Sequence, residues 1–229
     1  MIEGLPPFPG ILPEGIQFLR DLDANNDRAW FQPRKMQFDE LLQWPMKCLI
    51  SEAGERVSAA GIPLIGNPER GIFRIYRDVR FSKNKAPYKT TVGGCLSRSG
   101  KAKDHGVLYI HIAPDELFVA AGFYHPEMST VRRWRSALTQ APDPFLEVVD
   151  GLAAVDLTLA SFGDELKRLP KGTEHLADHP IAPYLKYKSF TTVRSFAPEA
   201  IHAPSFVDEV VQTAHDTAAL LHFGWSIGE

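Results

Sequence analysis

The stretch KTTVGGCLSRSGKAKDHGVLYIHIAPDELFVAAGF, residues 89–123, decides the fold class. It contains three short segments rich in β-branched and aromatic residues, at 89–96, 107–112 and 117–123, separated by polar connections. Successive strands on short connections are typical of an antiparallel meander, because parallel strands need a long crossover. We therefore expect an antiparallel sheet here, and the similar composition of residues 71–81 predicts one more strand before it.

Apolar residues recur at helical spacing on both sides of this meander. Before it they extend to residue 60, with a bend expected at Pro45, which removes one helical hydrogen bond. After it, residues 128–138, 143–149 and 205–221 predict helices, and residues 185–194 predict a further strand.

The order of these segments indicates an α+β fold, in which an antiparallel β-meander packs against N-terminal and C-terminal helices. We expect a single domain over residues 1–229. Its parts are N-terminal helices at 14–60, the meander at 71–124 and a C-terminal helical part at 128–229.

The composition is that of an ordinary globular protein. The 229 residues are 44% apolar and 23% charged, with a net charge of −3, which excludes a disordered, collagen-like or coiled-coil chain. Two cysteines, Cys48 and Cys95, are too few for a zinc site built on thiolates. The N-terminus has no basic region followed by an apolar run, and no uncharged apolar stretch reaches about 18 residues. We expect a reduced, cytoplasmic, bacterial protein without a membrane partner.

Positive charge gathers in one segment. Between residues 70 and 89 there are seven basic residues and one acid, Asp78, so this segment carries +6 and the other 209 residues carry −9. The basic residues are Arg70, Arg74, Arg77, Arg80, Lys83, Lys85 and Lys89. Such a local excess favours binding of an anion, whereas binding of duplex DNA usually needs a basic domain.

Strand periodicity sorts these residues into two faces. In a strand over residues 73–81, Arg74, Asp78 and Arg80 share one face, where the two guanidinium groups could grip a phosphate or carboxylate. Asp78 would then pair with an arginine or act as a base. Arg77 falls in an otherwise apolar row, and a buried cation needs a carboxylate or an anionic ligand. The alternative is an Arg–Asp network that only sets strand register.

The run from Arg74 to Lys89, RIYRDVRFSKNKAPYK, resembles the central motif of a family of bacterial and fungal conserved hypothetical proteins, domain of unknown function 2461. Residues 25–31, NNDRAWF, and residues 166–172, LKRLPKG, resemble further elements of that family, as does the region from Gly122 to Pro126. The resemblance covers nearly the whole chain. It implies that the Arg/Lys/Tyr segment matters throughout the family, and it supplies no reaction, metal or cofactor.

Other patterns are weaker. His175 and His179 have the i, i+4 spacing of metal ligands on a helix, but no third ligand is evident and we expect no metal. Tyr109 and His111 share a strand face, so His111 is either a general acid/base beside a bound anion or an ordinary hydrogen-bonded histidine. The pair Gly93-Gly94 predicts a bulge, or a close approach of backbone to a ligand.

Three functional hypotheses remain open. The first is metal-independent and cofactor-independent binding or turnover of a phosphate- or carboxylate-bearing small molecule or nucleotide. The second is a non-catalytic module that binds nucleic acid or an acidic protein through the same basic segment. The third is a structural Arg/Asp network, with the function elsewhere. The sequence sets neither the oligomeric state nor the choice between an enzyme and a binding protein.

The first hypothesis assigns roles to particular residues. The anion-binding candidates are Arg74, Arg77, Arg80, Lys83, Lys85 and Lys89. The candidates for moving protons are Asp78, Tyr88 and His111. A second basic set, which could complete the first in three dimensions, comprises Lys167, Arg168, Lys171 and Arg194.

Overall fold

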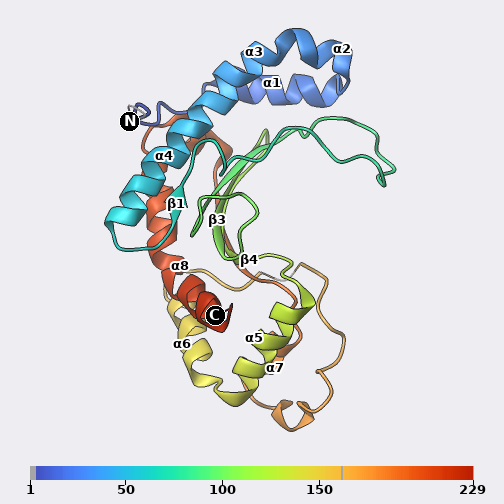
Figure 1. Cartoon of the computed structure of the whole chain (residues 1–229), viewed down its shortest axis with the longest axis vertical. Helices are drawn as coiled ribbons and strands as arrows, with labels where there is room; N and C mark the ends of the chain where they lie inside the picture. Colours follow the sequence, from blue (N-terminus) through green and yellow to red (C-terminus); the bar gives the residue numbers. More distant parts are fainter. Residues whose placement is uncertain (1–3, 161, 229) are drawn as a thin grey trace.

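A five-stranded antiparallel sheet lies at the centre of the molecule, and its strands are neighbours in the order in which the chain forms them (Figure 1). The computed structural model describes residues 4–160 and 162–228. The strands are β1 (Ile65–Gly66), β2 (Val92–Ser97), β3 (Val107–Ala113), β4 (Glu116–Phe123) and β5 (Phe190–Phe196). The α+β fold and the three central strands of the meander are therefore confirmed.

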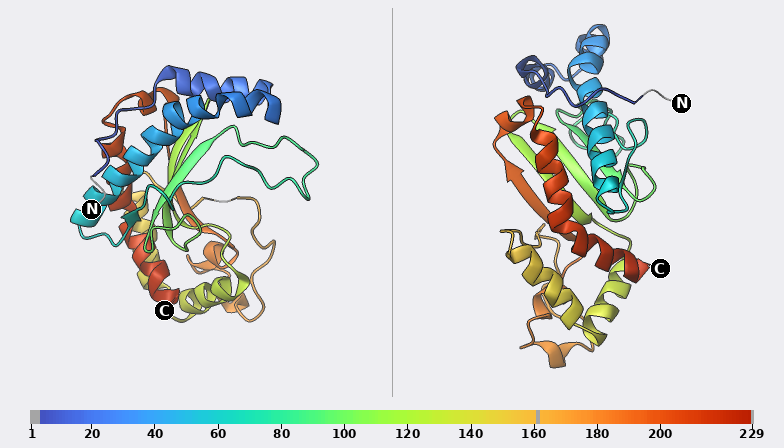
Figure 2. Two further views of the ribbon diagram at one scale, coloured as in Figure 1. Left: turned by 45° about the horizontal axis from the view of Figure 1, so that its top comes forward. Right: turned by 90° about the vertical axis from the view of Figure 1, so that its left-hand side faces the viewer.

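Helices precede the sheet, follow β4 and end the chain. They are α1 (Pro13–Ala24), α2 (Arg28–Phe31), α3 (Lys35–Phe38), α4 (Trp44–Ala59), α5 (Met128–Gln140), α6 (Asp143–Ala153), α7 (Ala182–Leu185) and α8 (Phe206–Gly228). The two long helices α4 and α8 contact each other and cover the same face of the sheet, as the right-hand view of Figure 2 shows.

Burial alternates along β3, and this alternation fixes which face the helices cover. Leu108, Ile110 and Ile112 are fully buried, whereas Tyr109 and His111 between them are only partly buried. Successive strand side chains point to opposite faces, so the first set faces α4 and α8 and the second faces the other way. We call this second side the open face of the sheet.

The helix irregularity expected near Pro45 is present as a π-helical turn over Asp39–Gln43, directly before α4. A proline ring clashes with the carbonyl group four residues earlier, which is that of Leu41. The wider turn gives that carbonyl room, and Pro45 then lies in the first turn of α4, where a missing N–H costs nothing.

The strand predicted over residues 71–81 is wrong. Residues 73–89 instead form an arm of two facing extended segments that projects away from the sheet (Figure 1). An isolated bridge between Tyr76 and Tyr88 joins its two segments, and a second bridge, between Ile72 and Gly94, lies at its base. The side chain of Asn26 also bonds the backbone N–H and carbonyl of Tyr88, which ties the arm to the N-terminal helices. Phe81 near its tip is 96% exposed, so the predicted apolar face of this segment does not exist as such.

Two smaller expectations also need correction. Residues 185–194 are not one strand, because α7 extends to Leu185 and β5 begins only at Phe190. Gly93-Gly94 forms no bulge, since Gly93 pairs with His111 and Gly94 with Ile110 in unbroken register. The two glycines serve close approach instead, of Tyr109 to Gly93 and of Ile50 and Met46 to Gly94.

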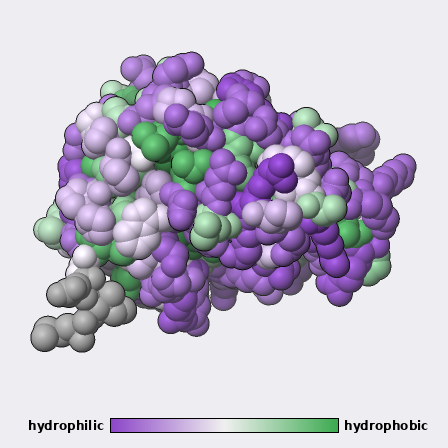
Figure 3. Space-filling view, turned by 90° about the horizontal axis from the view of Figure 1, so that it is seen from above, coloured by the Kyte–Doolittle hydropathy of each residue, from purple (hydrophilic) through white to green (hydrophobic). Residues whose placement is uncertain are grey.

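The arm projects on the side of the sheet away from α4 and α8 (Figure 1). The segment between β4 and β5, residues 124–189, lies at the other end of the molecule, where its helices α5 and α6 contact α8 (Figures 1 and 2). We call residues 124–189 the C-terminal lobe; its core includes Trp134 stacked on Phe190, with ring centroids 3.9 Å apart. Seen from above, the molecule is largely hydrophilic, with hydrophobic side chains in small separate patches (Figure 3).

Candidate functional site

A cavity of about 630 Å³ lies over the open face of the sheet. Its walls come from the arm, the loop before β3, the strands β3 to β5 and the C-terminal lobe. The lining residues are Phe73, Lys89, Ala102, Lys103, Asp104, His105, Gly106, Val107, Tyr109, Phe118, Ala120, Ala121, Gly122, Phe123, Tyr124, Phe162, Thr191 and Val193. This volume is in the range that small-molecule sites occupy.

The floor of the cavity is hollow because small residues form it. Ala120 lies between Tyr109 and Val193 in the strand register, and Gly122 lies between Val107 and Thr191. A Cβ atom at Gly122 would stand 2.1 Å from the carbonyl oxygen of Phe190, and the φ angle of 131° also disfavours any other residue. No side chain can therefore fill this part of the floor.

Two lysines line the cavity, Lys89 and Lys103, and Lys89 is the more buried of them. Its Nζ lies 5.5 Å from the centre of the Phe73 ring, and among the described residues no carboxylate lies within 4 Å of it. Burial, and secondarily the positive charge of Arg74, lower the pKa of Lys89. Two cations therefore lie near each other here. Asp104 lines the same cavity and Arg74 acts on Asp78, but among the described residues neither carboxylate forms an ion pair with Lys89.

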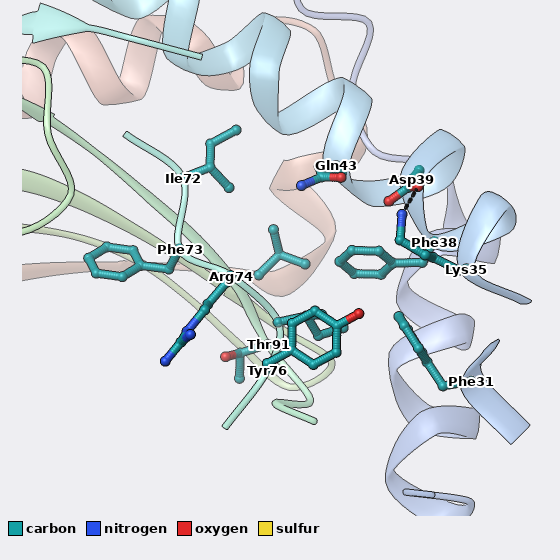
Figure 4. Close-up of a pocket in the computed structure, with 12 residues that line it drawn as sticks. Phe31, Lys35, Phe38, Asp39, Gln43, Ile72, Phe73, Arg74, Tyr76 and Thr91 are labelled. Atoms are coloured by element: carbon teal, nitrogen blue, oxygen red, sulfur yellow. Dashed lines mark hydrogen bonds and ion pairs between the residues drawn. The ribbon is translucent and has the colours of Figure 1, made fainter. Parts of the chain in front are cut away.

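Arg74 lies near enough to Lys89 for their charges to interact, but it lines a second, much smaller cavity and not the larger one. That second cavity, of about 100 Å³, lies between the arm and the N-terminal helices, and its lining includes the aromatic rings of Phe31, Phe38 and Tyr76. In Figure 4 the guanidinium of Arg74 points away from these rings. The small cavity holds only a few water molecules' worth of space, so the larger one is the candidate site.

Most other basic residues of the arm bind the arm itself. Arg77 donates to the carbonyl oxygen of Ala86 at 3.2 Å, and Lys85 Nζ donates to that of Val79 at 3.0 Å. Arg80 donates twice to the carboxylate of Asp78, at 2.9 and 2.7 Å. The remaining member, Lys83, is exposed near the tip.

The three candidates for moving protons have different neighbours. The hydrogen bond from Arg80 lowers the pKa of Asp78 on the exposed arm. Tyr88 is buried, its ring centroid lies 4.2 Å from that of Phe31, and its hydroxyl accepts from Gln32 at 3.2 Å. The structure therefore does not bring Asp78, Tyr88 and His111 together at one point.

The shared face of Tyr109 and His111 is confirmed. Their side chains are joined by a hydrogen bond of 3.1 Å between Tyr109 Oη and His111 Nδ1, and the imidazole stacks on Phe118 with ring centroids 4.5 Å apart. His111 Nε2 lies 3.4 Å from Glu116 but forms no well-aligned hydrogen bond among the described residues. Burial lowers the pKa of His111 and raises that of Tyr109 to about 12.

The second basic set does not assemble with the first as a whole. Arg194 lies on the helix-covered face, where it pairs with Asp216 of α8 at 2.6 Å and bonds the carbonyl of Val155. Lys167, Arg168 and Lys171 are exposed in the C-terminal lobe. Across residues 4–160 and 162–228, no three His, Cys, Asp or Glu side chains are placed to hold a metal ion.

Sequence reasoning missed Thr191. Its side chain is 5% exposed, it lines the cavity, and its Oγ1 has no hydrogen-bond partner among the described residues. The rim residues Tyr124 and Phe162, with ring centroids 5.1 Å apart, were missed as well. These residues lie far from the basic segment in sequence, and only the alternation along β5 could have placed Thr191 on the open face.

The family model for conserved hypothetical proteins named DUF2461 matches residues 14–223. The chain belongs to this family. The match runs from the first turn of α1 into α8, so DUF2461 comprises the sheet, the arm and the C-terminal lobe together. No curated protein and no solved structure matches the chain. None of the helices in the described part of this DUF2461 protein is long and apolar enough to cross a membrane.

Proposed function

We propose that this protein binds an anionic small molecule, one bearing a phosphate or carboxylate group, in the cavity over the open face. The observation that carries the proposal is Lys89, a partly buried ammonium in the cavity wall that forms no ion pair with any described carboxylate and lies near a second cation, Arg74. An unneutralised cation in an apolar cavity is unfavourable, and an anionic ligand offsets that cost through charge-assisted hydrogen bonds.

The proposal divides the basic segment into two parts. Lys89, which lines the cavity, and Arg74, whose charge acts on Lys89, contact the anion. Arg77, Arg80 and Lys85 already donate to acceptors within the arm and lie outside the cavity lining, so they stabilise the arm and do not contact the ligand. The same donors rigidify a segment whose two halves are joined by one isolated bridge, between Tyr76 and Tyr88.

A thermal-shift panel tests this function. The probes are inorganic phosphate, adenosine monophosphate, phenyl phosphate, benzoate and a short single-stranded oligonucleotide, each with wild type, Lys89→Met and the control Lys85→Met. Methionine keeps most of the lysine stem and removes only the charge. A probe at 100 times its Kd stabilises by about 2.7 kcal/mol, or roughly 5–10 °C for a chain of this size.

We expect a small-molecule shift that Lys89→Met abolishes and Lys85→Met retains. Shifts of equal size in all three proteins, or none with any probe, would overturn the proposal. The control is informative because Lys85 lies on the same arm but donates to Val79, outside the cavity.

A second candidate, binding of nucleic acid or an acidic protein, is favoured by the tip of the arm. Phe81 is 96% exposed, and the guanidinium of Arg80 lies 5.9 Å from the centre of its ring. Exposed aromatic and basic side chains together suit stacking on bases and contacts with phosphates. Oligonucleotide binding that falls steeply between about 50 and 200 mM salt, and is lost in Phe81→Ala, supports this candidate. Retention in that variant argues against it.

A further inference from the structure

The cavity has polar groups at two ends. Both lie over the open face, one toward the β2 side of the cavity and the other at β5. Lys89 lies in the segment leading into β2, and Thr191 is the second residue of β5. The strand order places β3 and β4 between them, and three strand spacings amount to roughly 14 Å. One small group cannot contact both ends.

Thr191 presents a hydrogen-bonding group that the protein itself does not use. Its neighbour Thr192 faces the other side of the sheet and donates to the carbonyl of Thr158 at 2.8 Å. Thr191 Oγ1 has no partner among the described residues, although its side chain is 95% buried. Buried hydroxyl groups are nearly always hydrogen-bonded, so an unpartnered one in a cavity wall indicates a ligand atom.

The surface between the two ends is apolar and includes flat rings. Phe73 and Tyr109 meet edge to face with ring centroids 5.6 Å apart, and Phe118 continues the aromatic surface along the floor. Ala120 and Val193 complete the floor toward Thr191. Aromatic surfaces of this kind favour a planar apolar partner over a hydrated, flexible one.

We infer that the ligand is an elongated organic anion with three parts. Its anionic group contacts Lys89 and Arg74, its planar apolar body crosses β3 and β4, and a hydroxyl, carbonyl or amide group at its far end bonds Thr191. This inference rests on the proposed function and narrows its ligand class. Inorganic phosphate and short carboxylates would satisfy only the first part, and would leave Thr191 without a partner.

Three biphenyl probes separate the contributions. 4′-Hydroxybiphenyl-4-carboxylate has both ends, biphenyl-4-carboxylate lacks the distal hydroxyl, and 4-phenylphenol lacks the anion. Isothermal titration with wild type, Thr191→Val, Lys89→Met and the control Ser195→Ala measures each affinity. Ser195 lies on the same face of β5 as Thr191 but outside the cavity.

We expect wild type to bind the hydroxy acid about tenfold more tightly than biphenyl-4-carboxylate, because its hydroxyl gives Thr191 a partner. Thr191→Val abolishes that advantage and Ser195→Ala keeps it. Since valine removes a hydroxyl that has no bond in the described structure, Thr191→Val also leaves the melting temperature of the free protein unchanged or raises it.

The possible failures can be told apart. If the advantage of the hydroxy acid is absent from wild type, or survives Thr191→Val, the elongated ligand is overturned, and Lys89-dependent binding of smaller anions would still uphold the proposed function. If none of the three biphenyl probes binds, the elongated ligand is likewise overturned, and the thermal-shift panel with smaller anions still decides the proposed function. If all three bind equally well to Lys89→Met and to wild type, the proposed function fails too.

Discussion

Replacing Gly93 by alanine tests the geometry of the open face directly. The new methyl group would stand 2.7 Å from Tyr109 Oη and 3.0 Å from the nearest ring carbon of that tyrosine. Ordinary contact begins at 3.4 Å, so the hydroxyl has to move by about 0.7 Å. The hydrogen bond to His111 is already 3.1 Å long. A displacement of that size away from Gly93 takes it beyond the range of a hydrogen bond.

The expected loss of stability follows from three contributions. Overpacking by one methyl group costs about 1–3 kcal/mol, and the broken hydrogen bond costs about 1 kcal/mol. Alanine in place of a strand glycine returns about 0.5–1 kcal/mol. The cavity gives the Tyr109 ring space to yield, so we expect a net loss of about 1–2 kcal/mol. That corresponds to a fall in melting temperature of about 2–4 °C per kcal/mol.

Urea unfolding and an NMR titration of His111 are the two assays. Displacing Tyr109 exposes the imidazole, so the lowered pKa of His111 should rise toward its ordinary value of 6.5. Gly94→Ala is the matched control: its methyl group meets the flexible ends of Ile50 and Met46 at 3.0 Å on the covered face. It should change stability by less than about 1 kcal/mol and leave the pKa of His111 unchanged. Wild-type stability and an unchanged His111 pKa in Gly93→Ala would refute this reasoning.

Three further predictions concern stability and thiol reactivity. Asp216→Ala leaves the guanidinium of Arg194 without its carboxylate partner, and the Arg194 side chain is only 20% exposed. Urea unfolding should therefore show a loss of about 2–3 kcal/mol in the free energy of unfolding. Arg194→Met should lower that free energy by less in the Asp216→Ala background than in wild type. Burial lowers the pKa of His111 in the folded state, so the unfolded chain binds more protons as pH falls below about 7. The free energy of unfolding should therefore drop between pH 7 and 5.5 by more in wild type than in His111→Gln. An equal dependence of that free energy on pH in the two proteins would contradict this. Burial raises the pKa of Cys95 to about 12, and Cys48 is also buried. A thiol-specific reagent at pH 8 should therefore label neither cysteine until urea unfolds the protein. Rapid labelling of the native protein would count against the packing described.

The meander could be predicted because its signal is local. Alternation along Val107–Ala113 and the short connection to β4 each specify an antiparallel pair without reference to the rest of the chain. The same logic placed Tyr109 and His111 on one face, and their hydrogen bond agrees. Helix α8 was also recognisable, although it extends to residue 228 rather than 221.

The arm could not be predicted, because its composition is that of a strand. Phe73, Ile75 and Val79 have the propensities of a sheet, yet whether a strand forms depends on a neighbour that supplies hydrogen bonds along its length. Here the facing segment gives only the bridge between Tyr76 and Tyr88. Arg77 was therefore expected in a buried apolar row, whereas it bonds a carbonyl within the arm.

Of the residues proposed to bind the ligand, the sequence indicated Lys89 and Arg74 but not Thr191. Lys89 and Arg74 belong to a cluster of like charges that is visible in any reading of the chain. Thr191 lies 102 residues after Lys89, and nothing about an isolated threonine indicates that its hydroxyl lacks a partner. That property arises from packing, once Gly122 and Thr191 become neighbours in the register of β4 and β5.

The cavity floor sets a limit on how this protein can acquire new specificities. At Gly122 the surface is main chain rather than side chain, and a replacement there would collide with the carbonyl of Phe190. Natural variation and directed evolution therefore have little to act on at this point of the floor. Tyr124 and Phe162 are exposed and free of that restriction, so libraries intended to change ligand preference should randomise these rim residues and leave Gly122 intact.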